Sequence, residues 1–191
     1  MANRKIGVFI GSLRKESFSR KVAIVIMKMF PAAYDMEIVE IGDLALYNQD
    51  IDDSGNLPPA WTFFREKLKT FDAFLFVTPE YNRSVPGGLK NALDVGSRPY
   101  GKNLWNGKPA AVVSVSTGTI SGFGANHHLR QSLVFVNVPT LQQPEVYIGN
   151  VDAMFNEQGE LINDETHEFL EIFMKEYMKW IEIISPKVAD L

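Results

Sequence analysis

Apolar runs that alternate with helix-like stretches constrain the fold of this 191-residue chain more than any other feature. Residues 6–10, 72–78 and 108–116 are predominantly apolar, as is typical of strands covered on both faces. Residues 36–41 alternate in polarity and predict a strand nearer an edge, and residues 140–148 predict a short last strand interrupted by Pro144.

Helices are predicted between and after these strands, because apolar residues recur at helical spacing. The expected helices span about 19–30, 58–70, 89–95, 125–136 and 163–184. Residues 42–60 are rich in turn formers and acids, and we expect a solvated connection there. Strands that alternate with helices predict an α/β fold, a doubly wound parallel sheet of five strands with helices on both faces. The chain shows no linker or repeat, so one domain is expected over 1–191.

Three loops follow apolar strands at 11–19, 78–87 and 116–124, and each leads into a helix. Ligands of such sheets bind beyond the carboxyl ends of the strands. In the first loop, Ser12, Ser17 and Ser19 supply hydroxyls and Arg14 supplies a guanidinium. These groups and the N–H donors of a helix N-terminus favour a phosphate. The same residues also fit an ordinary N-capped helix beside a solvated Arg14.

Composition and motifs exclude several classes of function. The net charge of −4, without blocks of like charge, argues against a nucleic-acid binder. No cysteine is present, so disulfides and thiolate chemistry are excluded. No signal peptide or apolar run of membrane-spanning length is evident, and a cytoplasmic protein that binds no membrane is expected.

No metal site or catalytic triad can be assembled from the sequence. The acids of 42–60 lack EF-hand spacing, and His127 and His128 are adjacent, which does not suit two ligands of one metal. Glu80 is the one carboxylate in a candidate loop, either as a general base or as a residue that shapes the loop. A site of amides, hydroxyls and aromatics without a nucleophile indicates that a cofactor supplies the reactivity. FMN fits the three loops, with its phosphate at 12–19 and its ring between 79–82 and 116–119.

Three sequence motifs carry a family resemblance. They are Gly11-Ser12-Leu13-Arg14-Lys15-Glu16-Ser17, Pro79-Glu80-Tyr81-Asn82 and Val85-Pro86-Gly87-Gly88-Leu89-Lys90-Asn91-Ala92-Leu93-Asp94. Together they closely resemble the NADPH-dependent FMN reductase family, over most of residues 4–148. Flavodoxin-like members of that family include bacterial quinone, chromate and azo-dye reductases, so the resemblance implies a flavodoxin-like fold.

The resemblance also implies a cofactor site. Its phosphate and ribityl contacts would be Ser12, Arg14, Ser17 and Ser19. Its ring contacts would be Pro79, Glu80, Tyr81 and Asn82, largely through backbone, with Ser116, Thr117 and Gly118 at the other edge. Ser19 departs from the Asn of many relatives, and 121–128 departs from their Gly-Gly-x-Arg pattern, which bears on the choice between NADPH and NADH.

The implied activity is that of an FMN-dependent oxidoreductase that takes hydride from NAD(P)H as co-substrate. It would pass electrons to quinones, azo or nitro compounds, chromate or free flavin by a ping-pong mechanism. The bound FMN would carry the chemistry, and no catalytic side chain is expected. A homodimer or homotetramer is implied, through the helix after Pro86. Tyr100, Leu104 and Trp105 fit such a partner surface, or else cover their own core.

Two alternatives remain at this level. One is a flavodoxin-type electron carrier that binds FMN without turning over NAD(P)H, and the other is a flavin-free regulatory or scaffold protein on the same fold. Arg14 and the modest net charge of −4 favour the reductase over the carrier.

Overall fold

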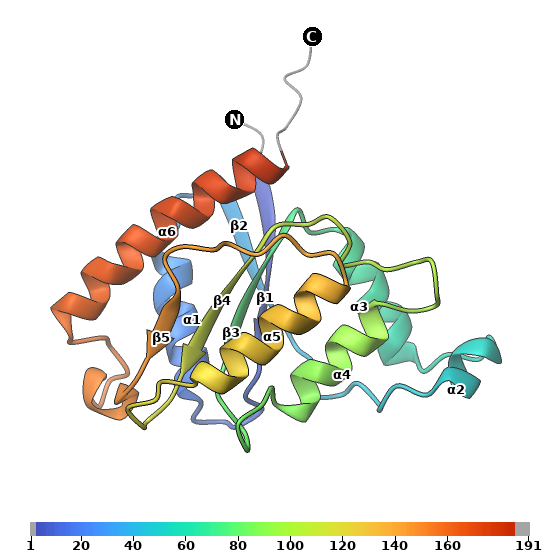
Figure 1. Ribbon diagram of the computed structural model, residues 1–191, viewed down its shortest axis with the longest axis horizontal. Coiled ribbons are helices and arrows are strands. Elements are labelled where there is room, and N and C mark those ends of the chain that lie inside the picture. Colours follow the sequence, from blue (N-terminus) through green and yellow to red (C-terminus); the bar gives the residue numbers. More distant parts are fainter. Residues whose placement is uncertain (1–2, 186–191) are drawn as a thin grey trace, which may run out of the picture.

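Five parallel strands form one sheet in the computed structural model, which describes residues 3–185 (Figure 1). The strands are β1 (Arg4–Ile10), β2 (Tyr34–Val39), β3 (Ala73–Thr78), β4 (Ala110–Val115) and β5 (Val146–Ile148). Their order is β2-β1-β3-β4-β5, which is the flavodoxin-like order, and every pairing is parallel. The predicted fold class is therefore confirmed. The strand predicted at 140–148 is shorter than expected, because β5 begins only after Pro144. Before Pro144, the segment 140–145 joins the sheet through one bridge, between Thr140 and Ala110.

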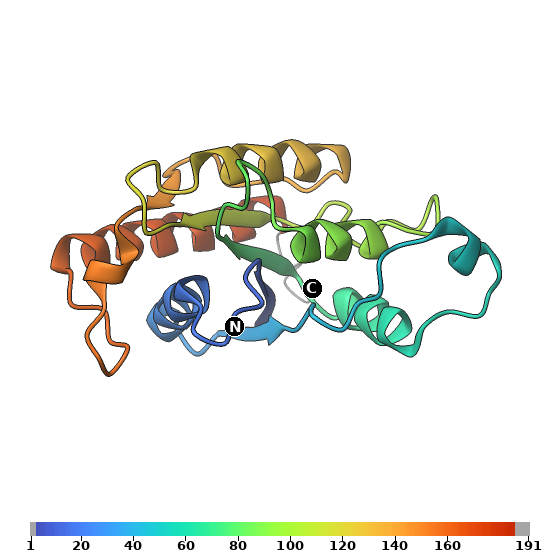
Figure 2. The same ribbon diagram turned by 90° about the horizontal axis from the view of Figure 1, so that it is seen from below.

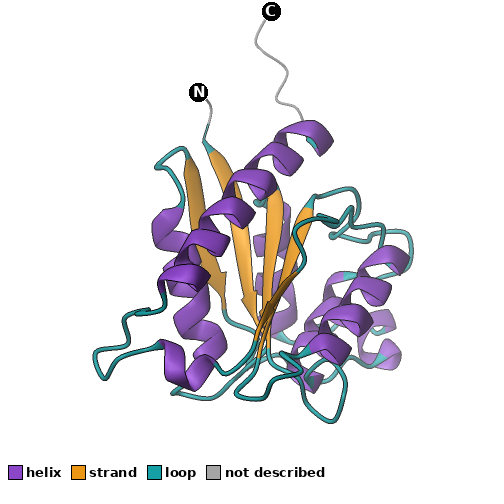
Figure 3. Ribbon diagram, turned by 60° about the vertical axis from the view of Figure 1, so that its left-hand side comes forward, coloured by secondary structure: helices purple, strands orange, loops and turns teal. Residues whose placement is uncertain are grey.

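Helices cover both faces of the sheet (Figure 3). They are α1 (Phe18–Met29), α2 (Gln49–Asp53), α3 (Pro59–Lys69), α4 (Gly87–Gly96), α5 (Phe123–Phe135) and α6 (Asp164–Ile184), with a 3₁₀ turn η1 (Val151–Met154). Side chains of α1 and α6 share one buried cluster with the strands, and those of α3, α4 and α5 share the other. No described helix has the length and apolar character that crossing a membrane requires.

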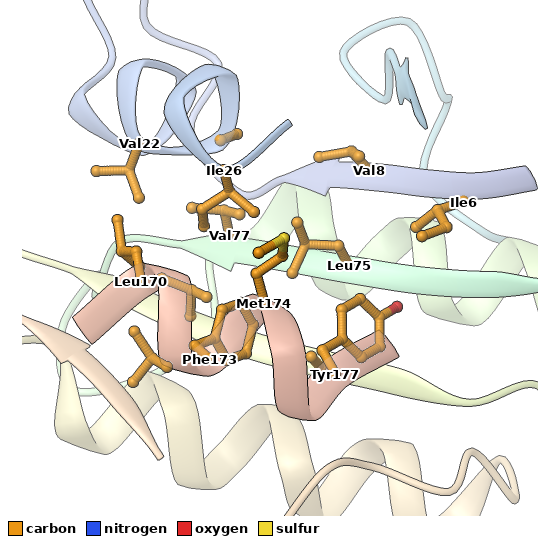
Figure 4. Close-up of a cluster of buried hydrophobic side chains, with 14 of the residues drawn as sticks. Ile6, Val8, Val22, Ile26, Leu75, Val77, Leu170, Phe173, Met174 and Tyr177 are labelled. Atoms are coloured by element: carbon orange, nitrogen blue, oxygen red, sulfur yellow. The ribbon is translucent and has the colours of Figure 1, made fainter. Parts of the chain in front are cut away.

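The last helix closes the α1 face of the sheet (Figure 4). Asn163 caps its start, accepting a hydrogen bond from the Thr166 N–H at 2.8 Å. Phe173 and Tyr177 point from this helix toward α1 and the strands. The fully buried Tyr177 hydroxyl donates to the Phe74 carbonyl at 2.6 Å, so its polar end is satisfied inside the core.

On the opposite face, Trp105 is a core residue, so of the two places considered for it the structure shows the core of its own chain and not a partner surface. Its ring is fully buried, and the ring centroids of Trp105 and Phe74 are 4.9 Å apart. The indole N–H of Trp105 donates to the Leu93 carbonyl at 3.1 Å. The absence of a side chain at Gly96 makes this possible, because a Cβ there would lie 2.5 Å from the indole nitrogen. Tyr100, by contrast, is 93% exposed.

The connection at 42–60 is more ordered than predicted. It contains α2, capped by Asn48, which accepts from the Asp50 N–H at 2.9 Å. Asp52 forms an ion pair of 2.7 Å with Arg65 of α3, and both side chains are buried. The expectation of a solvated loop is wrong here, because a buried carboxylate with a buried partner fastens α2 to the body of the protein.

Candidate functional site

The strand order reverses between β1 and β3, and the loops that follow β1, β3 and β4 gather at that end of the sheet (Figure 2). Residue pairs Ile10–Val77 and Thr78–Ser114 bring the three strand ends into register. Gly11 lets the first loop approach β3, because a Cβ there would lie only 2.6 Å from Oγ1 of Thr78. Topology thus creates a crevice between loops that are far apart in the sequence.

The first loop exposes unpaired backbone donors at the start of α1. Ser17 is the N-cap, and its hydroxyl accepts from the Arg20 N–H at 3.2 Å. Within residues 3–185, the backbone N–H groups of residues 15–19 have no hydrogen-bond acceptor. Together with the positive end of the helix dipole, these donors favour an anion.

Side chains of the same loop add to this preference for an anion. The Arg14 guanidinium is exposed and has no carboxylate partner in the described part of the chain. The Ser12 hydroxyl accepts from the Arg14 N–H at 3.4 Å, and Ser19 is buried and lines the crevice. An unpaired guanidinium beside a helix N-terminus is well suited to a phosphate.

The second loop is a tight turn after β3. Tyr81 and Ser84 exchange backbone hydrogen bonds of 3.1 and 3.0 Å, and Asn82 and Arg83 between them both have positive φ, 49° and 63°. This is the geometry of a two-residue hairpin turn. Asn82 occupies the exposed tip of the turn, while Pro79, Glu80 and Tyr81 face the crevice.

Glu80 holds this turn against α5. One carboxylate oxygen accepts from the Ala125 N–H at 3.0 Å, and the other accepts from the Arg83 guanidinium at 3.0 Å. The N-cap of α5 is Gly122, which has no side chain to cap with, so Glu80 supplies the acceptor from another part of the chain. The carboxylate is therefore engaged in shaping the loop, the second of the two roles considered for it.

The third loop follows β4. The Ser116 N–H donates to the Ile148 carbonyl at 2.8 Å, and its hydroxyl accepts from the Gly118 N–H at 3.0 Å. The Ser114 hydroxyl donates to the Ser121 carbonyl at 2.8 Å, and left-handed residues Ser121 and Gly122 then turn the chain into α5. Thr117 and Gly118 are both exposed in this loop.

A cavity of about 150 Å³ lies where the three loops meet. Its lining includes these predicted residues: Ser12, Arg14, Ser17, Ser19, Pro79, Glu80, Tyr81, Ser116 and Thr117. Asn82 and Gly118, also predicted, are not part of it. Phe18, Val115 and Val151 line the cavity but were not predicted, because an apolar side chain in a strand, helix or turn carries no signal that marks it as a site residue.

The histidines of α5 make hydrogen bonds with neutral side chains. His127 Nε2 lies 3.0 Å from the Tyr147 hydroxyl, and His128 Nδ1 lies 3.0 Å from the Ser84 hydroxyl. Over residues 3–185, no three side chains of the types that bind metals are grouped so as to hold an ion.

Comparisons with known proteins agree with this geometry. The model of the family described as NADPH-dependent FMN reductase matches residues 4–153. The chain belongs to the NADPH-dependent FMN reductase family. As a member, it is an oxidoreductase that uses FMN with NAD(P)H as co-substrate.

Relatives of this family member cover nearly its whole length. A quinone reductase of Pseudomonas putida is 54% identical over 178 residues, which are 93% of this chain and 95% of the relative. A 2-hydroxy-1,4-benzoquinone reductase of Burkholderia sp is 38% identical over 177 residues, 93% of this chain and 96% of the relative. Among solved structures, the flavoenzyme NAD(P)H:(acceptor) oxidoreductase FerB from Paracoccus denitrificans has a TM-score of 0.88 at 36% identity, covering 94% of this chain and 98% of FerB.

The crevice suits the cofactor that this reductase family uses. The unpaired N–H groups of residues 15–19 and the unpaired Arg14 guanidinium are a donor set for a phosphate dianion. Pro79 and Tyr81 line one side of the crevice and Ser116 and Thr117 line the other, and Tyr81 and Thr117 are exposed.

Proposed function

We propose that this protein is an NAD(P)H-dependent quinone reductase whose FMN is held in the crevice between the three loops. The observation that carries the proposal is the run of unpaired N–H donors at residues 15–19 beside the unpaired Arg14 guanidinium. Two relatives named as quinone reductases, 54% and 38% identical, support quinones as the acceptor class. Azo and nitro compounds, chromate and free flavin are further acceptors within this proposal.

The proposed roles of the residues follow from their groups. Ser12, Arg14, Ser17 and Ser19 hold the phosphate and ribityl chain, through hydroxyls, a guanidinium and the N–H donors around them. The proposed ring contacts are Pro79, Glu80, Tyr81, Asn82, Ser116, Thr117 and Gly118. Among them, the backbone N–H groups of Glu80, Asn82 and Thr117 have no acceptor within residues 3–185, and such fixed dipoles would stabilise charge that develops during reduction.

Bound FMN supplies the two-electron chemistry, accepting from NAD(P)H and donating to the acceptor. The chain would contribute binding and orientation. A bound ring with one exposed face would admit only one planar substrate at a time, so the co-substrate would leave before the acceptor enters. We therefore propose ping-pong kinetics. Double-reciprocal plots of initial rate against NADPH concentration, measured at several acceptor concentrations, should give parallel lines.

The test combines a spectrum with a pair of variants. Protein loaded with FMN should bleach when NADPH is added without air and recover its colour when a quinone follows. Arg14→Ala should weaken FMN binding about 10- to 100-fold, the usual contribution of a charged hydrogen bond. Lys15→Ala, which removes the neighbouring exposed cation, is the matched control and should change FMN binding by less than about threefold. Bound FMN that NADPH leaves oxidised would favour the flavodoxin-type carrier, and a chain that takes up no FMN would contradict the proposal.

We also propose a homodimer or homotetramer that resides in the cytoplasm. A groove of about 580 Å³ lies between α4 and α5, and Phe135 on its rim is 86% exposed. An apolar ring this exposed suits a face that a second copy covers. Light scattering should give a mass of two or four chains, and Phe135→Asp should lower it, whereas a monomer at micromolar concentration would contradict the proposal.

A further inference from the structure

Three aromatic rings cluster near the surface where α5 meets β5, and we call Phe123, His127 and Tyr147 the aromatic platform. Phe123 and His127 lie one turn apart on α5, with ring centroids 4.2 Å apart. Tyr147 comes from β5, with its ring 5.5 Å from Phe123 and nearly parallel to His127, at 13°. The rings thus join two elements that are far apart in the sequence.

The aromatic platform is not part of the hydrophobic core. None of its three residues belongs to either buried cluster of the described chain, and the Phe123 side chain is 52% exposed. The 3.0 Å hydrogen bond between His127 Nε2 and the Tyr147 hydroxyl fixes two of the rings. Rings that are ordered yet open to solvent are preorganised to stack on a planar ligand.

The platform adjoins the proposed FMN crevice. Gly124, next to Phe123, packs so closely on the second loop that a Cβ would lie 2.9 Å from the Glu80 carboxylate and 3.0 Å from the Arg83 carbonyl. Glu80 itself lines the cavity. Phe123 is therefore the neighbour, along α5, of a residue that packs against the loop lining the crevice.

Arg83, whose backbone carbonyl packs against Gly124, carries a cation on the second loop. The Arg83 guanidinium is 69% exposed, and its ion pair with Glu80 occupies Nη1 at 3.0 Å. Its Nη2 makes no hydrogen bond within residues 3–185. A stacking surface on α5, together with a guanidinium on the loop that α5 contacts, fits a ligand that has both a heteroaromatic base and phosphate groups, whereas a quinone is neutral and lacks phosphate.

We propose that the aromatic platform binds the adenine end of NAD(P)H, with Arg83 contacting a phosphate of the same molecule. This inference rests on the proposed function, because it assigns a second contact region to the co-substrate of that reaction. The reacting nicotinamide would lie in the crevice and the adenine on Phe123. The platform then determines affinity for the co-substrate and leaves the electron transfer itself unchanged.

The decisive experiment compares two co-substrates in FMN-loaded Phe123→Ala. One is NADPH, and the other is reduced nicotinamide mononucleotide, which lacks the adenosine. The KM for NADPH should rise about tenfold, as expected for the loss of one base stack, with kcat and FMN retention unchanged. The KM for the mononucleotide should not change. Phe63→Ala on α3, which removes another exposed ring (74%), is the matched control and should behave as the unmodified protein.

A direct binding measurement separates this inference from the proposed function. Calorimetry with adenosine 2′,5′-bisphosphate needs no turnover, and it should show binding that Phe123→Ala weakens about tenfold and that Arg83→Ala also weakens. A KM for NADPH that stays unchanged in Phe123→Ala, or that rises equally for the mononucleotide, would overturn the platform while leaving the reductase intact. If the FMN-loaded protein does not oxidise NADPH, the proposed function fails, and the calorimetry alone then decides whether the platform binds adenosine.

Discussion

The contact between Glu80 and α5 leads to the sharpest prediction about the site. The Glu80 side chain is 11% exposed and makes two hydrogen bonds of equal length, one to the Ala125 N–H and one to Arg83. The first satisfies a donor at a helix N-terminus that has no other cap, so losing the acceptor in Glu80→Ala should cost about 1–2 kcal/mol of unfolding free energy. The second involves a guanidinium that is 69% exposed, so Arg83→Ala should cost about 0.5 kcal/mol or less.

Glu80→Gln separates charge from hydrogen bonding at this position. Its amide oxygen still accepts from the Ala125 N–H, but the negative charge near the dipole of α5 is gone, so we expect a loss of about 0.5 kcal/mol. Because the bond also positions the turn that lines the crevice, Glu80→Ala should weaken FMN binding about tenfold, equivalent to 1.4 kcal/mol.

Urea denaturation of the FMN-free protein and fluorescence titration with FMN measure the two effects independently. Equal destabilisation by Arg83→Ala and Glu80→Ala would contradict the role of Glu80 as the cap of α5. So would a Glu80→Ala variant whose unfolding free energy and FMN affinity are both unchanged.

Three further predictions concern the elements that support the site. Ser17→Ala removes the N-cap of α1 and should cost about 1 kcal/mol, seen as a melting temperature lower by about 2–4 °C; an unchanged melting curve would show that the cap contributes nothing. Gly11→Ala places a Cβ 2.6 Å from Oγ1 of Thr78 and should destabilise the protein by about 1–3 kcal/mol in urea, so a neutral result would mean that the loop relaxes freely. Burial raises the pKa of Tyr177 well above 10. Above about pH 10 the unfolded state therefore loses the hydroxyl proton while the folded state keeps it, so the stability that this hydroxyl contributes falls as the pH rises. Tyr177→Phe should therefore be less stable than the unmodified protein by about 1 kcal/mol at pH 7, and the difference should narrow at pH 11; a constant difference would contradict the linkage.

Local sequence determined the fold class and the chemistry of the first loop. Apolar strands of six or seven residues alternate with helices, and this pattern needs no long-range information to be recognised. The serines and Arg14 stand within a few residues of a helix start, so their preference for an anion also follows from local order. The identity of the cofactor could also be predicted from local sequence, because each family motif is a short contiguous stretch.

Tertiary structure decided what depends on contacts between distant segments. Glu80 caps a helix that begins more than forty residues later, and Asp52 finds a buried partner on α3, so neither role is visible in the neighbouring sequence. Trp105 lies in a polar stretch that resembles a surface, yet Gly96 leaves space for its ring in the core. The aromatic platform likewise forms only because β5 places Tyr147 beside α5. The physical reason is the same in each case: hydrogen bonding, burial and stacking depend on distances in space, which the order of residues fixes only within one helix, strand or turn.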